Sequence, residues 1–245
     1  MHCEANALEL RQVSYQYPDG TAALTDVSVL IRHEQRVALL GPNGAGKSTL
    51  IGHLNGIIET QVGTVLVEDV PLTDATLSVV RQRVGVVFQD PDNMLFMTSI
   101  ADDIAFGPRN LGLHESQVHD RVTRAIAAVG LTGLENKPGM HLSFGQKKRA
   151  ALAAVLAMEP AVLVLDEPTS NLDPRGRREM LELVRSLDVT LLVATHDLEA
   201  AWELCGRALV IDEGRLVADG DAHDILRDRD LMLSHGLEVP LSAQL

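Results

Sequence analysis

The segment from Gly41 to Thr49 has the residue types and the spacing that bind a polyphosphate. Its residues are Gly41, Pro42, Asn43, Gly44, Ala45, Gly46, Lys47, Ser48 and Thr49. An apolar run at 37–40 precedes it and indicates a buried strand, while apolar residues spaced three and four apart at 50–58 predict a helix. Glycines allow a close backbone approach, so consecutive N–H groups and the positive end of the helix can face the phosphates. We expect Lys47 to reach the outer phosphates and the Ser48 hydroxyl to bind Mg²⁺.

Three more groups of polar residues follow apolar runs, at 84–88, 161–165 and 190–194. They are Gln89, the pair Asp166-Glu167, and His196. Apolar runs separated by helical segments predict a parallel sheet covered on both faces, and ligands of such sheets lie beyond the carboxyl ends of the strands. We expect Asp166 to complete the Mg²⁺ shell, with Gln89 as a further ligand, and Glu167 to orient or deprotonate a water. Gln89 and His196 are expected to sense the γ-phosphate. The alternative for the adjacent carboxylates is a helix cap.

Size and charge restrict the classes of function that this chain can have. It has 245 residues, 46% of them hydrophobic, and a formal net charge of −13. This length suffices for one α/β domain. The negative charge argues against nucleic acid as the main partner and against direct binding to anionic lipid, so a membrane role needs a protein partner. No uncharged apolar run approaches the roughly 18 residues that span a bilayer, and no signal-peptide pattern opens the chain, so we expect it in the cytoplasm.

The cysteines and histidines do not predict a metal site. Cys3 and Cys205 lack the spacing of a metal-binding pair, and a disulfide is not expected in a reducing compartment. The nine histidines form no cluster with metal-ligand spacing, so we expect most of them on the surface or in loops.

Two hairpins are predicted, one near each end of the chain. Residues 6–36 form strands around the turn Pro18-Asp19-Gly20, and the run 208–211 pairs with 215–218 across Asp212-Glu213-Gly214. Strand alternation puts Tyr15 and Tyr17 on one face of the first hairpin. That arrangement suits either a core or a platform on which a ligand ring stacks.

Capping residues mark the predicted helices between these hairpins. An amphipathic helix at 115–129 ends at Gly130, and Asp173 caps a helix that has Pro174 at its first position. Ser143 and Gln146 form a capping box for a helix that continues to Pro160. Its first turn carries three cations, at 147–149, where the helix dipole disfavours positive charge. They form either an anion site or a solvated basic face.

The stretch from Asp90 to Asp103 is acidic and contains flexible apolar side chains. From Val84 to Pro108 there is no Lys or Arg, and Met94-Leu95-Phe96-Met97 lies between the acids. Thioethers beside carboxylates suit an adaptable surface for a basic amphipathic helix. A folded-in apolar turn with solvated acids fits the composition too.

The order of these motifs over residues 6–235 resembles that of the ATP-binding cassette (ABC) ATPases. The sequence carries a phosphate loop at 41–49, a glutamine loop at Gln89, a signature at 142–146, a Walker B strand at 162–167, the segment 170–173 and a switch His196. The resemblance implies ATP and Mg²⁺ as ligands, with Tyr17 stacked on adenine. It also implies that two subunits meet head to tail, so that Ser143, Gly145 and Gln146 of one reach the γ-phosphate held by the other, together with the basic turn at 147–149. Asp173 would lie at the seam of that dimer.

Three segments resemble the energy-coupling-factor importers more narrowly. They are 88–93, 103–108 and 146–149, and the cobalt or nickel type is the most similar. This resemblance implies uptake of a transition-metal ion, a membrane coupling protein docked near Asp90–Asp103 and a substrate-capture membrane protein. Biotin or another vitamin is the alternative cargo, and a soluble ABC ATPase acting on DNA or ribosomes is the alternative function. One residue departs from the family pattern: Phe144 stands where the signature usually has glycine, which puts the rate of turnover in doubt.

The expected fold is α/β, with a parallel-sheet core of the RecA type, an N-terminal antiparallel β subdomain and a helical signature subdomain. We expect an ATP-binding domain at 6–235, its helical subdomain at about 90–158, and a tail at 236–245. Two copies of the chain are expected to pair on the cytoplasmic face of the cell membrane.

Overall fold

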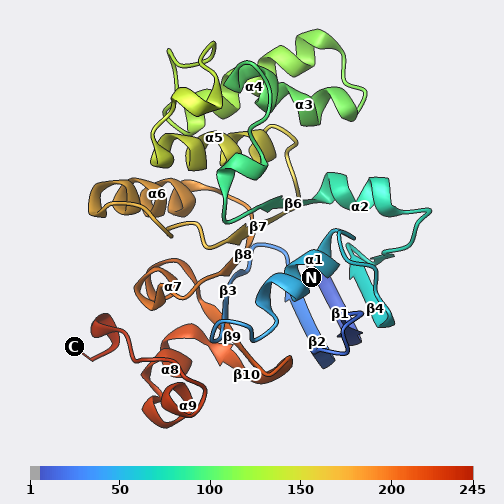
Figure 1. Cartoon of the computed structure of the whole chain (residues 1–245), viewed down its shortest axis with the longest axis vertical. Coiled ribbons are helices and arrows are strands. Elements are labelled where there is room, and N and C mark those ends of the chain that lie inside the picture. The colour runs from blue at the N-terminus through green and yellow to red at the C-terminus, as the bar shows by residue number, and fades with distance from the viewer. Residues whose placement is uncertain (1–5, 245) are drawn as a thin grey trace, which may run out of the picture.

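The computed structural model describes residues 6–244, whose strands form a four-stranded and a six-stranded sheet (Figure 1). The smaller sheet is antiparallel, in the order β2-β1-β4-β5. Its strands are β1 (Asn6–Gln16), β2 (Ala22–Arg32), β4 (Val62–Val67) and β5 (Val70–Pro71). The hairpin turn at 17–21 joins β1 to β2, as predicted, and each strand has 11 residues. This sheet is the predicted β subdomain.

The larger sheet has the order β10-β9-β3-β8-β7-β6. Its strands are β3 (Arg36–Leu40), β6 (Val84–Val87), β7 (Val162–Asp166), β8 (Thr190–Ala194), β9 (Arg207–Asp212) and β10 (Arg215–Asp221). Every neighbouring pair is parallel except β9 with β10, which form the predicted hairpin. The sheet therefore collects the ends of the apolar runs at one edge, as the sequence predicted.

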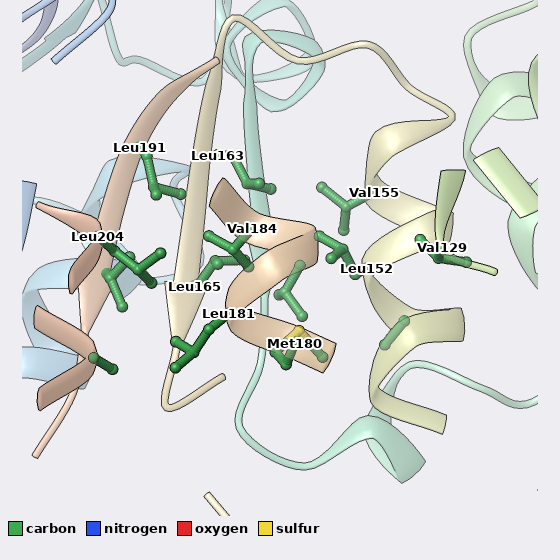
Figure 2. Packing of buried hydrophobic residues seen from close by; sticks show 14 of the residues in the cluster. Val129, Leu152, Val155, Leu163, Leu165, Met180, Leu181, Val184, Leu191 and Leu204 are labelled. Carbon is green, nitrogen blue, oxygen red and sulfur yellow. The ribbon is translucent and has the colours of Figure 1, made fainter. Parts of the chain in front are cut away.

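Side-chain alternation along the central strands divides the hydrophobic core into two layers. Leu163 and Leu165 of β7 face one layer, and Val162 and Val164 face the other. Figure 2 shows Leu163 and Leu165 directed towards Val184 and Leu152. Residues on both faces are fully buried because helices cover one side and the small sheet with α1 covers the other.

Three helices form a group of their own, and the others are distributed around the two sheets. A helical subdomain, at the top of Figure 1, contains α3 (Ile100–Asn110), α4 (Glu115–Ala128) and α5 (Phe144–Leu156). The other helices are α1 (Lys47–Leu54), α2 (Leu77–Arg83), α6 (Pro174–Ser186), α7 (Leu198–Leu204), α8 (Ala222–Arg227) and α9 (Arg229–Ser234). Short 3₁₀ turns lie at η1 (Pro91–Asn93), η2 (Gly139–His141) and η3 (Leu241–Ala243). No helix within residues 6–244 has the length and apolar character needed to span a membrane.

Two predicted helices end earlier than the sequence suggested. The helix after the phosphate loop ends at Leu54, because Gly56 has a φ of +67° and turns the chain, and Ile57 is 52% exposed. The prediction that apolar spacing at 50–58 marks one helix was therefore wrong beyond Leu54. The helix that opens at Ser143 ends at Leu156, before Pro160. The helix at 115–128 and its end near Gly130, with a φ of +66°, agree with the prediction.

Candidate functional site

A cavity of about 830 Å³ lies beyond the carboxyl ends of the central strands. It is lined by Tyr17, Gly41, Pro42, Asn43, Gly44, Gly46, Lys47, Ser48, Thr49, Gln89, Asp166, Glu167 and His196, among others. The predicted phosphate loop thus lies beside the three polar groups that follow other strands, because parallel strands deliver their ends to one edge. Of the predicted loop, Ala45 is 3% exposed and lies behind this lining. The volume is suitable for a nucleotide.

Two glycines of the phosphate loop occupy positions where a side chain cannot fit. Gly41 has a φ of +154°, and a Cβ there would lie 2.1 Å from the carbonyl oxygen of Ile211. Gly46 has a φ of +109°, and its Cβ would lie 2.5 Å from the carbonyl oxygen of Ala23. The loop is therefore pressed against β9 on one side and β2 on the other. A phosphate cradle of this shape requires glycine at both positions.

Lys47 is held against the loop that precedes it. Its Nζ donates to the carbonyl oxygens of Gly41 at 2.7 Å and Pro42 at 2.9 Å. Only 8% of the residue is exposed. Burial lowers the pKa of Lys47, and the charges of Glu167 and Asp166 oppose that change. A buried ammonium group at the start of α1 is a strong binding partner for phosphate oxygens.

Ser48 and Asp166 supply oxygen atoms at the floor of the cavity. The Ser48 Oγ lies 3.4 Å from Asp166 Oδ2. Burial and the neighbouring Glu167 raise the pKa of Asp166, whereas Ser48 and Lys47 lower it. A hydroxyl and one carboxylate fit Mg²⁺, which prefers oxygen ligands and is usually held with the help of substrate phosphates and water. Gln89 is exposed and lines the same cavity, so its amide oxygen is available just after β6, the strand next to β7.

Glu167 is the most constrained residue of the cavity. Its φ of +50° is rare for a side chain other than glycine, and such strain is typical of functional sites. The residue is 7% exposed. Its carboxylate accepts hydrogen bonds from the His196 backbone N–H at 3.0 Å and from the Thr195 hydroxyl at 3.2 Å. The His196 Nδ1 lies 2.8 Å from Glu167 Oε2. Glu167 therefore has a fixed carboxylate at the cavity wall, with an exposed imidazole directly in front of it.

Lys148 fixes the backbone of Glu167 from behind. Its Nζ donates to the Glu167 carbonyl oxygen at 2.6 Å and to the Ser170 hydroxyl at 3.0 Å. Burial lowers the pKa of Lys148 from 10.5 to about 8, while the charges of Glu167, Asp166 and Asp90 act in the opposite direction. Since Lys148 is 4% exposed, it cannot reach a ligand at the surface.

The other two cations of this first turn also have partners inside the chain. The Lys147 Nζ lies 2.7 Å from Asp92 Oδ1, and the Arg149 guanidinium lies 3.7 Å from Glu179 Oε2. The sequence left open whether the turn forms an anion site or a solvated basic face. In the described residues each of these three cations contacts an oxygen atom of the same chain. Neither alternative predicted this.

Because Lys148 binds protons less tightly when folded, the stability of the chain should rise with pH between about 8 and 10.5 through this residue. Replacing Lys148 by Met removes that dependence. We expect the unfolding free energy of the wild type, relative to the Lys148→Met variant, to increase by about 2 kcal/mol from about pH 7.5 to about pH 9.5. Urea unfolding of both proteins at the two pH values measures it. The opposing contribution of Cys205, whose pKa burial raises to about 12, is common to both and cancels. A difference that is independent of pH contradicts the burial of a charged Lys148.

Tyr17 stands at the rim of the cavity with one face available. It is 38% exposed, and its hydroxyl lies 2.9 Å from the Thr49 Oγ1. Tyr15 packs edge-on against it, with ring centroids 5.1 Å apart, and against His53 at 5.0 Å. The two alternatives for these tyrosines therefore divide between them: Tyr15 packs against the core, and Tyr17 lines the cavity.

Four predicted site residues lie outside this cavity in the described chain. Ser143 and Gln146 cap α5, with the Gln146 N–H donating to Ser143 Oγ at 3.3 Å and the Ser143 N–H to Gln146 Oε1 at 3.0 Å. Asp173 caps α6 by accepting from the Gly176 N–H at 2.6 Å. Gly145 lies beside them in the first turn of α5. The fold of a single chain therefore does not bring these four residues to its phosphate loop.

Phe144 occupies the first position of α5 with a negative φ, so the backbone there does not require glycine. Its ring centroid lies 5.7 Å from the Lys148 Nζ. The aromatic ring thus covers the buried ammonium group that supports Glu167.

Several residues that line the cavity were not predicted from the sequence. Thr21, Ala22, Ala23 and Leu198 line the cavity, and so do Gly236, Leu237 and Glu238 from the predicted tail. The first three could have been placed from the hairpin that carries Tyr17. The residues at 236–238 could not, since their position depends on how α8 and α9 pack.

Comparison with known proteins identifies the family of this chain. The family model described as ABC transporter matches residues 24–170. The energy-coupling factor transporter ATP-binding protein EcfA of Methanothermobacter thermautotrophicus is 45% identical over 97% of this chain and 78% of its own length. EcfA of Carboxydothermus hydrogenoformans is 45% identical over 98% of this chain and 89% of its own.

Among solved structures, cbiO1 of Clostridium perfringens, described as part of the ABC transporter complex cbiONQ, has a TM-score of 0.83. It is 38% identical, and the match covers 98% of both chains. The predicted resemblance to the energy-coupling-factor ATPases is confirmed by these relatives. Since the family model spans more than half of the chain and the relatives nearly all of it, this protein belongs to the ABC transporter family and is one of its ATPases.

Proposed function

We propose that this chain is the ATP-hydrolysing subunit of an energy-coupling-factor importer, with the cavity at the phosphate loop as its ATP site. The observation that carries the proposal is the Glu167 carboxylate, held by Thr195 and the His196 backbone at the wall of a phosphate-binding cavity. A fixed carboxylate beside a polyphosphate cradle is what a hydrolytic water requires.

Binding begins at the phosphate loop. The N–H groups of the loop and the start of α1 face the β- and γ-phosphates, and the Lys47 ammonium group exchanges its two carbonyl partners for phosphate oxygens. Tyr17 stacks on the adenine ring at the rim. Ser48 and Asp166 would hold Mg²⁺, with Gln89 after the neighbouring strand β6, and the bound ion would neutralise charge on the phosphates.

Hydrolysis depends on Glu167 and His196. The carboxylate of Glu167 orients an attacking water and accepts its proton, and its backbone is fixed by Lys148. His196 lines the cavity while its Nδ1 contacts the Glu167 carboxylate, so as an imidazolium, with N–H on both ring nitrogens, it can donate from Nε2 to the γ-phosphate. Gln89, between β6 and the helical subdomain, lines the same cavity as Glu167 and His196 and would sense whether the γ-phosphate is bound.

We propose that two copies pair to complete the site. Ser143, Gly145 and Gln146 at the N-terminal end of α5 lie away from their own cavity, and this positive helix end suits a γ-phosphate held by the partner copy. Asp173, which caps α6, would lie at the seam between the copies. ATP drives pairing only if it binds the closed dimer more tightly than the open one.

The membrane partner is proposed to dock near Asp90–Asp103. Phe96 is 61% exposed and Phe106 is 42% exposed, and their rings pack edge to face with centroids 5.2 Å apart. Asp103 beneath them is buried and accepts from the N–H groups of Phe96 and Met97 at 2.8 and 2.9 Å, so this aromatic pair is held in place. Asp90 and Asp92 are exposed and Asp102 is half-buried in the same stretch, and these acids favour a basic amphipathic helix as the ligand.

The cargo is proposed to be a cobalt or nickel ion, captured by a separate membrane protein. This choice rests on the resemblance of segments 88–93, 103–108 and 146–149. Biotin or another vitamin remains the alternative, because the cargo would be recognised by other subunits.

We further propose that residues 6–235 form the ATP-binding domain, with its helical subdomain at about 90–158 and a tail at 236–245. We propose that this domain lies on the cytoplasmic face of the membrane.

The proposed function predicts that the chain co-purifies from membranes with a polytopic partner, and that the aromatic pair is required. We expect the double variant Phe96→Ser, Phe106→Ser to lose most of the partner, because about 2–4 kcal/mol of apolar contact is removed. Binding of labelled ATP should be unchanged. The control is Ile57→Ser, which removes a similarly exposed apolar side chain. Equal recovery of the partner with the double variant and the control contradicts docking at this surface.

A further inference from the structure

The segment from His235 to Ser242, here called the C-terminal strap, forms one wall of the nucleotide cavity. Gly236, Leu237 and Glu238 line the cavity together with the phosphate loop. A Cβ built on Gly236 would lie 3.9 Å from the Cβ of Pro42, so the strap is in van der Waals range of that loop. The Leu237 side chain is 7% exposed and belongs to the larger hydrophobic core, which fixes the strap at its middle.

One end of the strap is attached to the strand that supports the phosphate loop. The His235 Nδ1 lies 2.8 Å from Asp212 Oδ2. Asp212 ends β9, and the preceding residue, Ile211, has the carbonyl oxygen that leaves no room for a side chain at Gly41. The base of the phosphate loop and the start of the strap therefore share one support.

The other end is attached to the helix that follows the switch histidine. The Glu199 Oε1 accepts from the N–H of Leu241 at 2.6 Å and from that of Ser242 at 3.3 Å. Glu199 lies in the first turn of α7, three residues after His196. Hydrogen bonds to a carboxylate are stronger than those between neutral groups, so this attachment orders the end of the strap.

We propose that the C-terminal strap is part of the nucleotide site in the same protomer, and that Glu199 and His235 act as positioning residues for ATP binding. Neither residue contacts the reacting atoms. Each holds a wall of the cavity that would otherwise have to be ordered when the nucleotide binds, which costs binding free energy. The inference rests on the proposed ATP site and adds a segment that the phosphate loop does not contain.

Variants at the two attachments test the proposal, each with a matched control. Glu199→Ala is compared with Glu203→Ala, which removes the same charge from the same helix but breaks ion pairs with Arg185 and Arg177 and leaves the strap attached. His235→Ala is compared with His223→Ala, whose ring packs on Trp202 instead. Affinity for fluorescently labelled ATP is measured at protein concentrations where gel filtration shows single chains, and KM, kcat and the urea midpoint are measured in parallel.

We expect Glu199→Ala and His235→Ala each to weaken ATP binding about five-fold and to raise KM similarly, with kcat within about two-fold of the wild type. The controls should bind ATP like the wild type. A change in kcat or in unfolding midpoint without a change in affinity overturns the positioning role, and so does an equal loss in test and control variants. If Lys47→Ala binds ATP normally, the proposed site itself is wrong. If Lys47→Ala fails to bind while both strap variants bind normally, only the role of the strap is wrong.

Discussion

Replacing Glu167 by Gln is expected to abolish ATP hydrolysis while leaving ATP binding intact. The amide keeps an oxygen that can accept from the His196 backbone, so the geometry of the cavity is preserved, but it cannot take a proton from water. A general base contributes about 10²- to 10⁴-fold to rate, and we expect a loss in this range. Phosphate release measures turnover, and titration with labelled ATP measures binding. Equal rates in the variant and the wild type would defeat the assigned role.

Glu159→Gln provides the matched control. Glu159 has a φ of +55°, close to that of Glu167, but its carboxylate pairs with Arg121 and Arg124 outside the cavity. The Glu159→Gln variant therefore makes the same chemical change in the same unusual backbone conformation. Full activity of this control, beside an inactive Glu167→Gln, attributes the loss to the carboxylate at the site.

Lys47→Ala should weaken nucleotide binding itself. The ammonium group is buried at the start of α1, and a hydrogen bond to a charged partner contributes about 1.5–3 kcal/mol, so affinity should fall about 10- to 100-fold. The same titration with labelled ATP measures it. Lys137→Ala, at an exposed position outside the cavity lining, should bind normally. Wild-type affinity for Lys47→Ala would exclude this loop as the phosphate site.

These two variants separate binding from chemistry at neighbouring positions. Lys47 acts on the phosphates in both ground and transition states, so its loss weakens binding. Glu167 acts on water only as the reaction proceeds, so its loss reduces kcat. The structure is consistent with these separate roles. The Lys47 ammonium group lies within the phosphate loop, where it donates to the Gly41 carbonyl oxygen. The Glu167 carboxylate is held at the cavity wall by the hydroxyl of Thr195, directly after β8.

Local signals explain which parts of the site the sequence predicted. Ser143 and Asp173 were recognised as helix caps because a cap is defined by residues three apart, and both make the expected bonds. Gly41 and Gly46 were assigned to a phosphate loop because their spacing is fixed by the strand and helix on either side. The parallel direction of the strands was predicted from the alternation of apolar runs and helices, but their order in the sheet was not.

Contacts between distant segments explain what the sequence did not predict. Lys148 supports Glu167 although the two are 19 positions apart, and no local pattern distinguishes it from Lys147, which pairs with Asp92 at the surface. The strap reaches the phosphate loop only because α8 packs against β9 and β10 and α9 packs against α8. Likewise, Ile57 continues the apolar spacing of α1, and the turn at Gly56 removes it from the helix.

The most direct test of this account is whether two chains pair around ATP. Purified Glu167→Gln, mixed with ATP and Mg²⁺, should elute in gel filtration with light scattering at about twice the 26.5 kDa of one chain. It should return to the single-chain mass when ATP is removed or when Lys47→Ala is added to the same protein. A mass of one chain at saturating ATP and Mg²⁺ would contradict the proposal that two copies complete the site.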